Sequence, residues 1–168
     1  YYGYYEARAK SMKAAVCNAF WLYDPLVESV KYKEGEYSEE IDIFEIFGKA
    51  NKKENQRAYD AAVHRYQTPY VESLVNKKKY KLENRFTRLE VPFDFYEDFH
   101  IYGLLWMPDE LVWYLDGKEV FRRKNDFFKR PLHMIFDAEI MEKWDGLPDR
   151  EDLPSTFEVD YVRVWRPN

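Results

Sequence analysis

The chain has 168 residues, the length of one domain, and 46% of them are hydrophobic, which supplies a core and argues against a disordered chain. Its 26 Lys and Arg residues are outnumbered by 31 Asp and Glu residues, and the basic clusters at 77–79 and 122–124 are too short to follow a phosphate backbone, so no nucleic-acid partner is expected. No run approaches the ~18–20 apolar residues of a membrane span, so no membrane partner is expected, and the single cysteine, Cys17, excludes a disulfide within the chain.

The predicted elements are mostly short strands separated by turns. The polar stretch 26–38 is interpreted as a loop, and residues 54–65 are the best helical candidate. Strands are expected, in chain order, at residues 1–10, 19–23, 40–47, 100–106, 110–115, 118–122, 132–140 and 157–165. Short strands at this spacing, with almost no helix, indicate an all-β fold over 1–168, either a β-sandwich or a jelly roll.

Two of these strand predictions carry local detail. The pair Asp116–Gly117 tolerates the positive φ of a type I′ turn and predicts a tight hairpin between the strands around it. In the last strand, alternation places Phe157, Val159 and Tyr161 on one face and the acids between them on the other.

Residues 40–47 carry three acids, Glu40, Asp42 and Glu45, inside an apolar strand. Side chains alternate along a strand, so Glu40 and Asp42 share one face, whereas Glu45 of a regular strand would turn into the opposite layer. An unpaired carboxylate in that layer would be strongly unfavourable. A β-bulge near Ile43 and Phe44 would shift the register by one residue and return Glu45 to the side of Glu40.

Two glutamates at this spacing suit the cleavage of a glycosidic bond. Their Cα atoms would lie roughly 13 Å apart at ~3.4 Å per residue, and side chains that lean inward can bring the carboxyl groups to the ~5–5.5 Å of a retaining glycosidase. Asp42 lies close enough to form a hydrogen bond with Glu40. Its negative charge would also raise the pKa of a neighbouring glutamate, as a general acid that works near neutral pH requires. From the pattern alone a solvated edge strand and a calcium site remain alternatives, although Ile and Phe fit an edge poorly and calcium sites usually draw on loops.

The segment 40–45, EIDIFE, resembles the E-x-D-x-x-E signature of glycoside hydrolase family 16, in the bulged form of its laminarinase, agarase and porphyranase branches. Three further segments are similar to the family in the same order: 2–10 to its Y-G-y-x-E-a-R strand, 99–117 to its F-H-x-Y-x-x-x-W…W-Y-x-D-G block, and 159–165 to its closing strand. The resemblance implies a β-jelly roll of two curved antiparallel sheets with a concave substrate cleft. It also implies endo-acting hydrolysis of a β-linked polysaccharide with retention.

The resemblance also implies roles for particular residues. Glu40 would be the nucleophile, Glu45 the general acid/base, and Asp42 the residue that orients and tunes Glu40. No cofactor is required, while a structural calcium ion is compatible with the family and Asp160 is the candidate ligand. The family's domain is longer on its N-terminal side, so the chain is expected to be N-terminally incomplete and, with unpaired sheet edges, poorly stable alone.

A red-algal galactan is the substrate that the resemblance favours. Laminarinase-like members carry W-P-x-x-G-E before the signature, whereas this chain has GEYSEE at 35–40. The segments 20–23 and 139–148 are more similar to agarase and porphyranase relatives, which act on red-algal galactans. An agar- or porphyran-type polysaccharide is therefore the expected partner.

Several residues outside the signature are candidate substrate contacts. Trp21 and Trp144 lie beside polar or loop sequence and are expected to stack on pyranose rings. The strand tryptophans Trp106, Trp113 and Trp165 are expected in the core, with a place at the border of the cleft as an open alternative for Trp106. The polar candidates are His64, His133, Glu139 and Arg65. The basic side chains that could meet a sulfate group are Arg65, Arg57 and Lys49, for which plain solvation is an open alternative, as a structural role is for His64.

Three other functions remain open from the residues. One is a β-1,3(4)-glucanase of laminarinase type, and another is a transglycosylase that intercepts the same covalent intermediate. The third is a non-catalytic carbohydrate-binding jelly roll, which has no need of a second carboxylate. A polymer cannot cross a membrane intact, so a secreted, periplasmic or cell-surface location is expected. The protein is also expected to be a monomer.

Overall fold

The computed structural model describes residues 1–24, 37–67 and 83–167. Within them, ten strands form two antiparallel five-stranded sheets, ordered β10-β1-β6-β7-β8 and β5-β4-β3-β2-β9. The first sheet contains β1 (Gly3–Lys10), β6 (His100–Trp106), β7 (Glu110–Leu115), β8 (Lys118–Lys124) and β10 (Glu158–Trp165). The second contains β2 (Cys17–Tyr23), β3 (Tyr37–Phe47), β4 (Ala58–Gln67), β5 (Glu83–Glu90) and β9 (His133–Glu139). A short helix, α2 (Glu142–Asp145), and a 3-10 turn, η2 (Arg150–Asp152), lie between β9 and β10.

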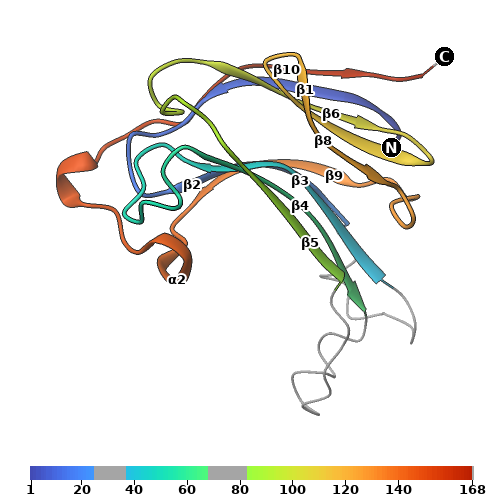
Figure 1. Cartoon of the computed structure of the whole chain (residues 1–168), viewed down its shortest axis with the longest axis horizontal. Helices are drawn as coiled ribbons and strands as arrows, with labels where there is room; N and C mark the ends of the chain where they lie inside the picture. The colour runs from blue at the N-terminus through green and yellow to red at the C-terminus, as the bar shows by residue number, and fades with distance from the viewer. Residues whose placement is uncertain (25–36, 68–82, 168) are drawn as a thin grey trace, which may run out of the picture.

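The two sheets are stacked as layers, as Figure 1 shows, and the sheet that contains β3 arches with α2 under one of its ends. The predicted all-β sandwich is therefore confirmed. Of the predicted loop 26–38, residues 26–36 lie outside the described residues, and the loop prediction is wrong for residues 37–38, which belong to β3. Among the described residues, no helix is long and apolar enough to cross a membrane.

The core lies between the inner faces of the sheets. Every second residue of β1 is buried there, and the predicted core residues Trp106 and Trp113 are 0% and 1% exposed. The prediction for Trp165 is wrong, because this residue is opposite Tyr4 on the outer face of its sheet and remains 46% exposed. The side chains that fill the core thus come from both sheets, and they pack against the core-facing side of β3 and fix its position.

The helical prediction for 54–65 is wrong, because residues 58–67 form β4, an internal strand of the second sheet. Tyr59, Ala61 and Val63 are buried in the core, and Ala62 is buried on the opposite face. With both faces covered, the period-two pattern of polar and apolar residues is hidden, and the alanines and charges resemble a helix instead. The edge strand β5 was not predicted either; three of its exposed residues, Arg85, Arg88 and Glu90, are charged, and Phe86 is exposed beside them.

The hairpin is confirmed, whereas the alternation predicted for the last strand holds only in part. Asp116 and Gly117 have φ values of 50° and 75°, as a type I′ turn requires. In β10, Asp160 is an extra residue between the partners of two adjacent β1 residues, which makes a β-bulge. Beyond this bulge the faces exchange, so Tyr161 points outward, where its hydroxyl donates to Glu6 over 3.0 Å, rather than inward with Phe157.

Candidate active site

The central strand β3 carries the bulge that the acids predict. On the β2 side, Asp42 and Phe44 are two residues apart but lie opposite adjacent residues, Trp21 and Phe20. On the β4 side, Asp42 and Glu45 are three residues apart but lie opposite residues that are only two apart. One residue is therefore inserted before Glu45 relative to both neighbouring strands, and the predicted bulge is confirmed.

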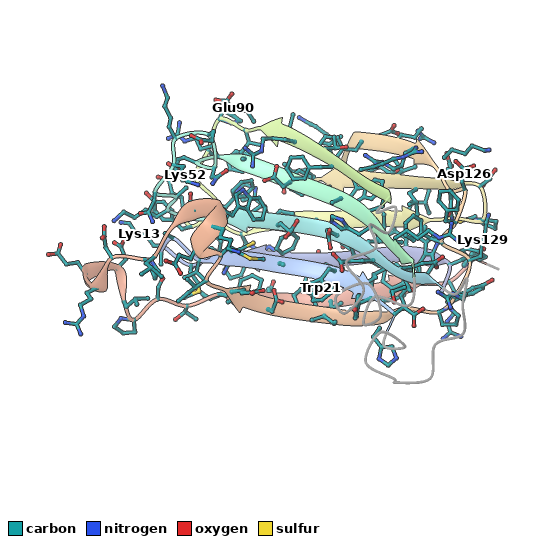
Figure 2. The ribbon with its side chains drawn as sticks, turned by 90° about the horizontal axis from the view of Figure 1, so that it is seen from below. Lys13, Trp21, Lys52, Glu90, Asp126 and Lys129 are labelled. Atoms are coloured by element: carbon teal, nitrogen blue, oxygen red, sulfur yellow. The ribbon has the colours of Figure 1, made fainter. Side chains whose placement is uncertain are left out.

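The bulge puts the three acids on one face of the sheet. Ile43 and Phe44 are both fully buried in the core, so alternation resumes one residue later than in a regular strand. Glu40, Asp42 and Glu45 line one cavity of about 190 Å³ on the outer face of the second sheet. Figure 2 looks onto this face, where Trp21 of β2 lies beside β3. The sequence prediction that Glu45 returns to the side of Glu40 is confirmed.

Burial and like charge raise the pKa of two of these acids. Burial raises the pKa of Asp42 to about 8, and Asp137 adds to the rise. Burial likewise raises the pKa of Glu45 to about 8; Asp42 adds to the rise most among the neighbouring charges, while His64 opposes it. Each carboxyl is therefore held in its neutral form well above the pH at which an exposed acid ionises.

A buried ion pair borders Glu45 on the β4 side. Asp60 lies opposite Glu45 and has a side chain that is 2% exposed. Arg88 of β5 donates Nε–H and Nη2–H to its two oxygens, each over 2.7 Å. Burial raises the pKa of Asp60 and this pair opposes the rise. The charge of Asp60, beside Glu45, is thus matched by a bidentate cation.

The predicted contact His64 lies at the site, because it is directly opposite Glu40 in the pairing of β3 with β4. Its Nε2 is 3.1 Å from Oδ2 of Asp42 and 3.7 Å from Oε1 of Glu40. One ligand atom from each of the three residues lies within 4.8 Å of the others, a spacing at which a divalent cation could be held. The same arrangement puts the imidazole of His64 within reach of both Glu40 and Asp42, where it can stabilise a negative charge on either carboxyl group.

The predicted ring contact Trp21 also lines the cavity, together with Glu139. Trp21 donates its Nε1–H to Oδ2 of Asp137 over 3.2 Å, which fixes the indole across β2 and β9. Asp137 lines the cavity as well and was missed by the sequence reasoning, although strand alternation from Glu139, two residues away, could have found it. Burial raises the pKa of Asp137, the Trp21 hydrogen bond opposes this, and Glu139 adds to the rise.

Two predicted contacts lie on the same face but outside the cavity lining. Trp144 of α2 packs edge-on against Phe47, with ring centroids 5.2 Å apart, and Phe47 follows Glu45 by two residues. His133 is exposed at the start of β9 and shares the face of Asp137 through alternation. Neither ring is among the residues that line the cavity, so contact with a longer ligand stays a prediction for both.

The structure does not bring Arg65 to the cavity. Arg65 follows Val63 by two residues and therefore lies on the core side of β4, the side opposite His64. Its Nε is 3.7 Å from Oε1 of Glu39, and its guanidinium carbon is 4.3 Å from the ring centroid of Phe127. The one-residue offset from His64 thus puts the arginine on the wrong face for a substrate contact.

The other charged candidates are engaged elsewhere. Lys49 pairs with Asp152 at 2.6 Å, and Arg57 pairs with Asp94 at 2.9 Å. Asp160, the candidate calcium ligand, pairs with Arg8 at 2.8 Å. Within the described ranges it belongs to no group of three acids or histidines that could hold a metal, so its calcium role stays a prediction.

Comparison with known proteins gives a consistent result. A family model described as Beta-porphyranase A-D, GH16 domain, matches residues 1–167. The kappa-carrageenase of Pseudoalteromonas carrageenovora is 30% identical over 178 aligned residues, which cover 98% of this chain and 43% of that protein. Beta-porphyranase B of Zobellia galactanivorans is 29% identical over 98% of this chain and 57% of that protein. The chain thus spans about half the length of these two relatives.

Solved structures share the fold. A complex of the P. carrageenovora kappa-carrageenase with a carrageenan oligosaccharide superposes with a TM-score of 0.72 at 28% identity, over 98% of this chain and 64% of that one. The laminarinase catalytic domain of Thermotoga maritima superposes with a TM-score of 0.73 at 25% identity, over 99% and 64% of the two chains.

Proposed function

Because the chain belongs to glycoside hydrolase family 16, we propose that it supplies the catalytic site of a retaining endo-glycosidase that cleaves a β-linked galactan of agar or porphyran type. One observation carries the proposal: the inserted residue in β3 that turns Glu45 into the same cavity as Glu40. A carbohydrate-binding module has no need of such a bulge, because stacking rings alone can hold a sugar.

The reaction proceeds in two displacements. Glu45 gives its proton to the glycosidic oxygen while a carboxylate oxygen of Glu40 attacks the anomeric carbon, so the bond to the leaving sugar breaks and an ester to Glu40 forms. Glu45, now ionised, takes a proton from water, whose oxygen attacks the same carbon and releases Glu40. Both displacements invert the carbon, and the net result is retention.

The surroundings of the acids support these roles. With a pKa of about 8, Glu45 is roughly nine-tenths protonated at pH 7, whereas a pKa of 4.5 would leave about 0.3% of the acid form. Asp42, held neutral by the same burial, can donate its proton in a hydrogen bond to Glu40. His64, whose Nε2 is 3.1 Å from Asp42 and 3.7 Å from Glu40, is within reach of both groups.

The charge of the cavity bears on the sugar at the cleavage point. In the part of the chain that the structure describes, the cavity is lined by no Arg or Lys and by five acids, namely Glu40, Asp42, Glu45, Asp137 and Glu139. A sulfate ester on the reacting ring would meet this negative field without a basic partner. We therefore assign an unsulfated galactose to the ring that reacts, with any sulfate on rings farther along the chain.

A panel of polysaccharides tests the function. The full-length protein is incubated with agarose, porphyran, kappa-carrageenan and laminarin, and new reducing ends are measured beside those of a Glu40→Ser variant. Release of oligosaccharides from agarose or porphyran by the parent alone supports the proposal. Products only from laminarin would replace the galactan with a glucan, and products only from kappa-carrageenan would overturn the unsulfated reacting ring.

The location follows from the substrate. A polymer of this size cannot cross a membrane intact, so the enzyme works where the polysaccharide is, as a secreted, periplasmic or cell-surface protein. Detection of the protein in the medium or on intact cells after fractionation tests this, and recovery only from the cell interior would contradict it.

A further inference from the structure

The bulge in β3 removes main-chain groups from the regular ladder, and two buried side chains bind the carbonyls that it exposes. The indole N–H of Trp113 donates to the carbonyl oxygen of Asp42 over 2.9 Å. The hydroxyl of Tyr59 donates to the carbonyl oxygen of Ile43 over 2.7 Å. A buried carbonyl without a donor is unfavourable, so both bonds stabilise the bulged strand relative to a regular one.

The two donors are themselves held rigidly. Trp113 comes from β7 in the opposite sheet and is 1% exposed, while Tyr59 comes from the neighbouring strand β4 and is 0% exposed. The Tyr59 ring is stacked on Phe121, with centroids 5.6 Å apart, and lies 5.9 Å from the ring of Tyr102. The hydroxyl and the N–H therefore reach the bulge from two directions, with little freedom to move.

We propose that Tyr59 and Trp113 are positioning residues for the reaction, because they hold the bulge and thereby set the direction of Glu45 relative to Glu40. The inference rests on the proposed function, since it requires that Glu40 and Glu45 act on one bond. Neither donor faces the cavity, so each acts through the backbone of Asp42 and Ile43. Displacement of a catalytic group by ~1 Å can lower the rate about 100-fold, so a change in the shape of the bulge is expected to lower kcat.

Removal of one hydroxyl tests the inference. Tyr59→Phe keeps the ring and deletes only the donor to Ile43. Tyr102→Phe is the matched control, because the Tyr102 hydroxyl is buried nearby and has no hydrogen-bond partner among the described residues. In the full-length protein, Tyr59→Phe is expected to lower kcat at least about tenfold, to leave KM within about twofold, and to shift the alkaline limb of kcat/KM, while Tyr102→Phe keeps the parental values.

A second variant covers the other donor. Replacement of Trp113 by β-(3-benzothienyl)alanine keeps the bicyclic shape and exchanges the N–H for sulfur, which cannot donate to Asp42. The same loss of kcat with little change in KM is expected. Circular dichroism confirms that each variant is folded at the assay temperature, so the rates refer to native protein.

The outcomes separate this inference from the proposed function. If Glu40→Ser turns over substrate like the parent, the proposed function itself fails. If Glu40→Ser is inactive but folded Tyr59→Phe and the Trp113 replacement keep the parental kcat and pH profile, only the positioning role is overturned. A failure of both variants to fold under conditions where Tyr102→Phe folds would also overturn it, because the two bonds would then support the whole domain rather than the site.

Discussion

The buried carboxyl of Glu45 should make the protein less stable as the pH rises, and Glu45→Gln should remove this effect. Burial and the neighbouring acids raise the pKa of Glu45 from 4.5 to about 8 in the folded chain. Between these values the folded state keeps a proton that the unfolded state has lost. The resulting stabilisation is fully present below pH 4.5 and is lost as the pH rises through about 8.

The size of the effect follows from the shift. One pKa unit corresponds to about 1.4 kcal/mol, so a rise from 4.5 to about 8 gives at most about 5 kcal/mol across the window. Glutamine has the shape of the neutral acid and does not titrate. The free energy of unfolding of Glu45→Gln should therefore match that of the parent near pH 4.5 and exceed it by up to about 5 kcal/mol above pH 8.

Urea unfolding followed by tryptophan fluorescence measures this difference at intervals between about pH 4.5 and about pH 9. Glu90→Gln is the control, because Glu90 is exposed at the end of β5 and its replacement should leave the pH dependence unchanged. If the free energies of unfolding of the parent and of Glu45→Gln fall in parallel over the whole range, Glu45 is not a buried neutral acid and the assignment of the general acid is refuted.

Three further changes test other parts of the account. Glu40→Ser should abolish turnover and spare oligosaccharide binding in calorimetry, so hydrolysis at the parental rate would disprove the nucleophile. Trp21→Ala should raise KM several-fold more than it lowers kcat, since stacking binds ground state and transition state alike, and an unchanged KM would remove Trp21 from the binding site. Arg88→Met leaves Asp60 buried without its cation and should lower the free energy of unfolding by about 2–3 kcal/mol, less than for a fully buried pair because Arg88 is 30% exposed. The exposed pair of Arg122 supplies the control Arg122→Met, which should cost much less, and equal losses would contradict the argument.

The site could be predicted from the sequence because of a conflict between charge and alternation. Glu45 would have entered the core if β3 were regular, and only an inserted residue avoids that. The same alternation places Glu139 and Trp21 in the cavity, because each lies two residues from another position on the same face. It did not suffice for Arg65, because the register of β4 was unknown while residues 54–65 were assigned to a helix.

The features that sequence reasoning missed depend on contacts between distant residues. β4 is covered on both faces, so the sequence around Asp60 and Ala62 has the mixed polar and apolar pattern of a helix. Only the structure shows that Asp60 pairs with Arg88 and that Asp60 and Ala62 lie opposite the bulged part of β3. The bulge at Asp160 could not be predicted in the same way, because Asp160 is an exposed acid that pairs with Arg8 at the surface and creates no conflict with burial. The hydrogen bonds from Tyr59 of β4 and Trp113 of β7 to β3 join residues that are distant in the sequence, so only the three-dimensional structure shows them.

The stereochemistry of the first product shows whether Glu40 and Glu45 reach one glycosidic bond from opposite sides in two displacements. Proton NMR of a β-linked galactan digest, recorded before the sugar mutarotates, shows which anomer appears first. The β anomer is expected first, because each of the two displacements inverts the anomeric carbon once. First appearance of the α anomer would mean a single displacement by water and would contradict the role of Glu40.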